Sequence, residues 1–231
     1  MSVDKDLWMV RAAMCEFLAF SLRYPTDELA VALASGEWQG AAREICAALG
    51  VEAPENYLVD LPCAKEGSIA EKRVEKLLRE LRPEATYLFV GAPTPACSPY
   101  EGICRAEADG VQALMFVNPR SVEVERFCHA CGLGSPANTN EPLDHIATEL
   151  ELLEVLSLRA AGATGQAEGE GWIVPEIDLP GGSASAAYDL FVSEHLSAWA
   201  PEFAERLLVE ARIPFYRCVA ALMSSFASVR I

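Results

Sequence analysis

The spacing of the apolar residues constrains the fold of this chain more than any other feature. Between residues 7 and 24 the apolar side chains recur at steps of three and four, as on one face of an amphipathic helix, and Pro25 ends the segment. Similar stripes run along most of the 231 residues, and no segment alternates apolar with polar side chains as a half-buried strand does. We therefore predict an all-α fold of about 8–11 helices, and the length favours a single domain over residues 1–231.

Proline, glycine and capping residues predict where the helices begin and end. Thr26 is expected to cap a short helix that runs to Ser35, and Gly50 is expected to end a helix that begins at Glu37. Further helices are predicted over residues 68–91 with a kink at Pro83, 99–117, 119–131, 141–161, 184–199 and 201–227 with a break at Pro214. Loops are predicted at 51–67, 91–99 and 132–140, and a mobile glycine-rich loop at 162–182.

The charge balance narrows the classes of partner. The chain has 34 Asp and Glu residues against 18 Lys and Arg, a formal charge of −16, which disfavours nucleic acid and anionic lipid and favours a basic ligand. No apolar run is long enough to cross a bilayer, and the first residues carry acids where a secretory signal has basic residues. We therefore expect a cytoplasmic protein without an integral membrane segment, whose 8 cysteines are thiols.

The motifs of several enzyme classes are missing from the sequence. There is no glycine-rich nucleotide loop, and none of the three histidines is preceded at three residues by glutamate, as a di-iron helical bundle requires. Cys128 and Cys131 form a CxxC motif, but no second cysteine or histidine pair stands at zinc-site spacing. This pair is therefore interpreted as core packing in preference to a metal site, and no cofactor is expected.

The segment from residue 140 to 150 is the most informative about function. Pro142 is expected to start a helix, with Glu141 and Asp144 near its positive end. His145 and Glu149 are four residues apart and would share a helix face, so that the carboxylate could orient the imidazole and raise its pKa. An ion pair on a solvated face explains the same spacing equally well, and as metal ligands the two residues would lack a third.

Several segments in a fixed order carry a family resemblance. They are Phe17-Leu-Ala, Tyr24-Pro25, Leu88-Phe-Val-Gly91, Ser98-Pro-Tyr-Glu101, Glu141-Pro-Leu-Asp-His145 with Glu149-Leu150, and the ladder Phe191, His195, Trp199 and Phe203. Together they resemble the TorD/DmsD/NarJ-like family of cytoplasmic chaperones for molybdenum-cofactor oxidoreductases, also called redox enzyme maturation proteins. The resemblance runs from about residue 11 to the end. The chain departs from the family pattern at Ala85, Ser98, Gly102 and Cys104.

The resemblance implies an all-α chaperone without catalytic activity or cofactor. Such a protein binds the twin-arginine signal peptide of an apo-form molybdoenzyme catalytic subunit and delays export until the cofactor is inserted, acting as a monomer or homodimer. The predicted peptide-binding residues are Leu88, Phe89, Tyr100, Glu101, Glu141, Pro142, Asp144, His145 and Glu149. The carboxylates of this set can accept hydrogen bonds from the guanidinium groups of the peptide, and its apolar side chains can bury the apolar part of the peptide. The ladder of residues 191–203 is expected to be core.

Two other functions stay open at this point. The first is a metal-dependent or thiol-redox helical enzyme that uses His145, Glu149 and the Cys128/Cys131 pair. The second is a helical adaptor that binds protein without a preference for paired arginines.

Overall fold

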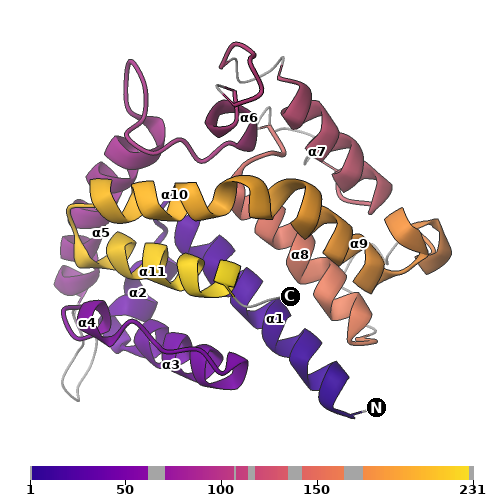
Figure 1. Cartoon of the computed structure of the whole chain (residues 1–231). Helices are drawn as coiled ribbons and strands as arrows, with labels where there is room; N and C mark the ends of the chain where they lie inside the picture. Colours follow the sequence, from indigo (N-terminus) through magenta and orange to yellow (C-terminus); the bar gives the residue numbers. More distant parts are fainter. Residues whose placement is uncertain are drawn as a thin grey trace. The chain divides into compact units, whose positions relative to one another are not determined.

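The computed structural model describes residues 2–61, 71–106, 108–113, 118–134, 142–163 and 174–228 (Figure 1). The fold is all-α, which confirms the predicted class. Within these residues there is no β-strand, and Tyr100 and His145 form an isolated antiparallel bridge. None of the helices in this part of the chain is both long enough and apolar enough to cross a membrane.

The chain divides into two compact units, and each is built from segments far apart in the sequence. The first unit contains Met1–Ala19 and Pro99–Ala200, and the second contains Phe20–Ser98 and Pro201–Arg230. The single domain over residues 1–231 stays a prediction.

The first unit is organised around α8. Its helices are α1 (Ser2–Leu22, up to residue 19), α6 (Glu101–Cys104), α7 (Pro119–Ala130), α8 (Ile146–Ala160), η2 (Glu176–Asp178), η3 (Pro180–Gly182), α9 (Ala184–Phe191), the π-helix η4 (Val192–Leu196) and the start of α10 (Ser197–Glu210). Helix α8 packs against α9, and α6 packs against α7. Nine of the residues of α8 are buried, including polar Thr148, Glu149 and Ser157, so this helix forms the core of the unit.

The second unit has α2 in contact with two other helices. It contains α2 (Asp27–Ser35), α3 (Glu37–Leu49), α4 (Glu55–Leu58), α5 (Glu71–Ala85), the π-helix η1 (Thr86–Val90), the rest of α10 and α11 (Pro214–Ser228). Helix α2 packs against α3 and α5, and α4 packs against α11. Trp38 is buried in this core, where its indole N–H donates a hydrogen bond of 3.0 Å to the Ser21 hydroxyl and its ring meets Phe215 edge-on.

Predicted helix boundaries that depend on local capping are confirmed. The Thr26 hydroxyl accepts a hydrogen bond from the Leu29 amide at the start of α2. Gly50 ends α3 with a φ of +70°, in the left-handed region where glycine has no steric penalty. Residues 91–99 have no helix, as predicted. The start of the helix predicted over residues 68–91 lies outside the described residues.

Other predicted boundaries are wrong, and at α6 and α8 a distant segment supplies backbone partners. Of the helix predicted over residues 99–117, the described residues contain α6, and residues 107 and 114–117 lie outside them. The Asn118 side chain donates to the Gly102 carbonyl and caps the start of α7. The helix predicted over 141–161 begins at Ile146. The loop predicted at 51–67 contains α4, and α10 continues through Pro201. Of the loops predicted at 132–140 and 162–182, residues 135–140 and 164–173 lie outside the described residues, and η2 and η3 occupy part of the second.

Candidate functional site

Two segments that carry the family resemblance are joined in the first unit. Residues Tyr100 and His145 pair as a short antiparallel bridge, with the Glu101 amide donating to the Asp144 carbonyl at 3.0 Å. The Ile146 amide donates to the carbonyl of residue 99 at 2.8 Å, and the rings of Tyr100 and His145 meet edge-on at 5.2 Å. Residues predicted separately from two motifs therefore form one local structure.

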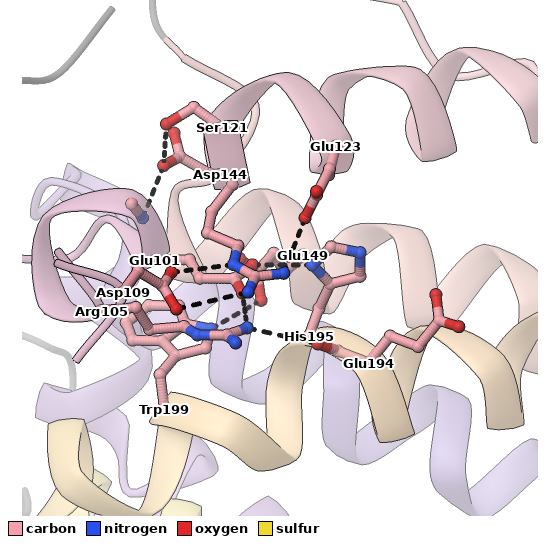
Figure 2. A network of polar contacts seen from close by, with 12 residues as sticks. Glu101, Arg105, Asp109, Ser121, Glu123, Asp144, Glu149, Glu194, His195 and Trp199 are labelled. Atoms are coloured by element: carbon pink, nitrogen blue, oxygen red, sulfur yellow. Dashed lines mark hydrogen bonds and ion pairs between the residues drawn. The ribbon is translucent and has the colours of Figure 1, made fainter. Parts of the chain in front are cut away.

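Asp144 is buried, and its carboxylate organises the segments around it. One oxygen, Oδ2, accepts hydrogen bonds from the Ser121 hydroxyl at 2.6 Å and from the Gly102 amide at 3.0 Å (Figure 2). The other oxygen, Oδ1, has no hydrogen-bond partner among the described residues. Burial raises the pKa of Asp144 above its ordinary value, and the two hydrogen bonds act in the opposite direction.

Gly102 is required at its position because a side chain has no space there. A Cβ atom at residue 102 would lie 2.6 Å from the Ser121 hydroxyl oxygen and 2.9 Å from the side chain of Asn118. The family pattern has serine where this chain has Gly102. In this chain the space is filled by Ser121, which also donates to Asp144. The departure from the family pattern thus has a steric explanation.

Glu101 is fully buried and has two charged or titratable partners. Its Oε1 accepts a hydrogen bond of 2.6 Å from Arg105, one turn later on the chain, and its Oε2 lies 3.0 Å from Nδ1 of His195 (Figure 2). Arg105 also donates to the Glu194 carbonyl at 3.2 Å. A buried carboxylate needs such partners, because removal from water without them is costly.

Glu149 is fully buried on α8, where the indole N–H of Trp199 donates to Oε2 at 3.2 Å. Its Oε1 has no hydrogen-bond partner in the part of the chain that the structure describes. Burial, followed by the charges of Glu101 and Asp144, raises the pKa of Glu149 well above its ordinary value. The site therefore favours the neutral carboxylic acid at this position.

His145 is the N-cap of α8 and not a residue within the helix. Its Nδ1 accepts a hydrogen bond of 3.1 Å from the Ala147 amide. The predicted helix face shared by His145 and Glu149 is therefore wrong, because the helix begins one residue after His145. The ion pair on a solvated face is also wrong, since His145 and Glu149 are both buried.

The remaining predicted residues fall into different environments. Pro142 and Tyr100 are half-buried in the first unit, and Glu141 lies outside the described residues. In the second unit Leu88 is fully buried, and the Phe89 ring contacts the rings of Phe203 and Tyr216. The ladder of residues 191, 195, 199 and 203 is buried, which confirms it as core.

The cysteine pair of the alternative function is buried. Burial raises the pKa of Cys128 to about 12 and that of Cys131 to about 11, which disfavours the reactive thiolate. The described residues contain no group of three or more His, Cys, Asp or Glu side chains that could hold a metal ion.

Four residues of the network were not predicted to belong to the site: Gly102 and Ser121 beside Asp144, Arg105 beside Glu101, and Trp199 beside Glu149. The pairing of Arg105 with Glu101 could have been predicted locally, because residues four apart on a helix lie side by side. The pairings of Ser121 and Trp199 could not, since these residues reach the site only through tertiary packing.

Comparison with known proteins agrees with the resemblance seen in the sequence. A family model described as "Nitrate reductase delta subunit" matches residues 32–205, more than half of the chain. A curated protein named "Chaperone protein TorD" from Aliivibrio fischeri (strain ATCC 700601 / ES114) is 22% identical over 152 residues, covering 66% of this chain and 63% of that protein. Another of the same name from Vibrio cholerae serotype O1 (strain M66-2) is 29% identical over 147 residues, covering 64% and 59%.

These alignments cover about three fifths of the length of the curated relatives. They confirm that the resemblance to TorD-like redox enzyme maturation proteins, found in separate motifs, extends over most of this chain. The family match and the joined motif segments together lead to one conclusion: the chain belongs to the nitrate reductase delta subunit family.

Proposed function

We propose that this protein is a cytoplasmic maturation chaperone for a molybdenum-cofactor oxidoreductase. In this function it binds the twin-arginine signal peptide and the apo-form of the catalytic subunit, and it delays export until the cofactor is inserted. The observation that supports this most is the joining of Tyr100-Glu101 to Asp144-His145, because these segments carry the family resemblance and the family match spans both. The two relatives are themselves named as chaperones.

The charge and the apolar surface of this protein suit a twin-arginine peptide. A twin-arginine peptide has two guanidinium groups followed by an apolar stretch, and the formal charge of −16 favours its encounter with the protein. Half-buried Tyr100 and Pro142 offer apolar surface in the joined segments. Asp144, in the same joined segments, is buried and accepts a hydrogen bond from the Gly102 amide. We infer that Tyr100 and Pro142 contact the peptide and that Asp144 positions the segment that carries them.

The test is calorimetric titration of the protein with a synthetic signal peptide that carries the paired arginines. We expect binding, and about tenfold weaker binding when both arginines are replaced by lysine, because an ammonium group lacks the planar fork of guanidinium. The Tyr100→Ala variant should weaken binding about tenfold, whereas Tyr24→Ala, at a tyrosine that is 55% exposed in the second unit, should stay within about twofold. Absence of binding, or equal binding of a scrambled peptide, would contradict the proposal.

The enzyme alternative can be tested on the same preparation. It requires a metal or a reactive thiol at His145, Glu149 and the Cys128/Cys131 pair, but the hydrogen bond from Ala147 engages Nδ1 of His145 and burial disfavours both thiolates. We expect elemental analysis to find well under one metal ion per chain. One tightly held ion that is lost in Cys128→Ser would support the enzyme instead.

A further inference from the structure

The second unit contains a partly open pocket that no sequence motif indicated. Its volume is about 240 Å³, and it is lined by residues from α2, α5, the start of α11 and the chain near α4: Leu33, Asp60, Leu61, Leu77, Glu80, Leu81, Ile213, Pro214 and Phe215. All nine residues belong to the second unit. The pocket is therefore defined without reference to the first unit.

The walls of the pocket are apolar. Leu77 and Leu81 stand one turn apart on α5, Leu33 comes from α2, and Phe215 follows the first residue of α11. An apolar cavity of about 150 Å³ holds a benzene molecule, so the space here is sufficient for the side chain of a leucine, methionine or phenylalanine. Water in such a pocket finds few polar partners, and an apolar side chain would replace it favourably.

The charged residues that line the pocket are both acidic and both exposed. Glu80 has Lys76 at 3.8 Å, but the two side chains are 52% and 77% exposed, and ion pairs of this kind are weak. Within the described part of the chain, no hydrogen bond or ion pair involves the Asp60 carboxylate. A ligand cation can therefore pair with either acid at little cost in lost contacts.

We propose that this pocket binds an arginine of the signal peptide together with the large apolar side chain that follows it. The apolar side chain fills the space between Leu33, Leu77 and Phe215, and the guanidinium group lies at Asp60 and Glu80. This inference rests on the proposed function and names for it a pocket within the second unit that takes an arginine. In this pocket the guanidinium group meets exposed carboxylates, whereas the carboxylates of Glu101 and Asp144 are buried.

The first test is a matched pair of charge reversals on α5, measured by calorimetric titration with the synthetic peptide. Glu80→Lys should weaken binding about fivefold or more, since attraction at the rim becomes repulsion. Glu75→Lys is the control: Glu75 is exposed and pairs with Arg79 at 3.1 Å, but it does not line the pocket. Each variant changes the net charge by the same amount and breaks one exposed ion pair on the same helix. The control should stay within about twofold.

The second test fills the pocket. Ile213 is half-buried at the lining, whereas Val209 is 79% exposed on α10 and lies outside the lining. Ile213→Trp should weaken peptide binding about tenfold, and Val209→Trp should leave it unchanged. A peptide in which serine replaces the apolar residue after the arginines should bind the Ile213→Trp variant no more weakly than the original peptide does. In this variant the apolar side chain of the peptide has already lost its pocket.

The outcomes separate this inference from the proposed function. If the wild-type protein binds the peptide and both pocket variants bind as well as their controls, the inference is overturned and the proposed function stands. If the wild-type protein does not bind the peptide, both are overturned. A dimer in sedimentation that Ile213→Trp dissociates and the peptide leaves intact would place a second copy of the chain in the pocket, and would also overturn the inference.

Discussion

Acidic residues have opposite environments in the two units. Glu101, Asp144 and Glu149 of the first unit are at most 1% exposed and are bonded to neighbouring segments, whereas Asp60 and Glu80 of the second unit are exposed beside an apolar pocket. A buried carboxylate contributes to stability when it satisfies buried donors, and removing it leaves them unpaired. An exposed carboxylate contributes little to stability and keeps its charge accessible to a ligand. The first group therefore holds neighbouring segments together, and the second group is accessible to a ligand.

Removing a carboxylate should show the largest difference between the two groups. Asp144→Ala leaves the Ser121 hydroxyl and the Gly102 amide without their acceptor, so we expect the free energy of unfolding to fall by about 2–5 kcal/mol. Asp60→Ala should change it by less than about 0.5 kcal/mol. Urea denaturation of the two variants measures both values. Similar losses in the two variants would remove the distinction.

The tight packing beside Asp144 gives a second prediction, with a control of opposite sign. Gly102→Ala places a methyl group 2.6 Å from the Ser121 oxygen, and we expect a loss of about 1–3 kcal/mol in the free energy of unfolding. Gly40→Ala, inside α3 with nothing within 4 Å of the new Cβ, should gain up to about 1 kcal/mol from helix propensity. Thermal or urea unfolding would contradict the packing argument if both variants changed in the same direction.

The raised pKa of Glu149 predicts how stability depends on pH. Above the unfolded-state pKa, near 4.5, the unfolded chain loses the proton that the folded chain keeps, so stability falls as the pH rises toward the folded-state pKa. The slope from one such group is at most about 1.4 kcal/mol per pH unit. Glu149→Gln removes this contribution, so its stability relative to wild type should increase as the pH rises above the unfolded-state pKa. Parallel profiles of the two proteins would show that Glu149 is ionised in the folded state.

The smallest expected effect concerns the rim of the pocket. Lys76→Ala frees Glu80 from its exposed ion pair, and we expect less than about 0.5 kcal/mol change in stability. Affinity for the peptide should rise by up to about twofold at low salt and return to the wild-type value at high salt, because exposed charges are screened. Arg79→Ala makes the same charge change at the Glu75 pair, away from the pocket. Equal gains in both variants would indicate a net-charge effect and no special role for Glu80.

The fold could be predicted well wherever the signal is local. Thr26, Gly50 and the helical stripes fixed boundaries because capping and periodicity depend on a few neighbouring residues. The shortness of α6 could not be predicted, because it depends on distant partners. The Asn118 side chain donates to the Gly102 carbonyl, and the Asp144 carboxylate accepts from the Gly102 amide. The family resemblance named Tyr100, Glu101, Asp144 and His145, and their binding of a peptide stays a prediction. The burial of Glu101 and Asp144 was not predicted.

The sequence alone determined the all-α class, the core ladder of residues 191–203, the acidic charge and the family, because each depends on residue type and spacing along the chain. Tertiary structure decided the partners of the acids. Ser121 meets Asp144 across 23 positions, and Trp199 meets Glu149 across 50. It also decided that Leu33, Leu77 and Phe215 surround one pocket. The physical reason is that burial and solvation depend on which distant segments pack together, and the local pattern of a helix does not specify its neighbours.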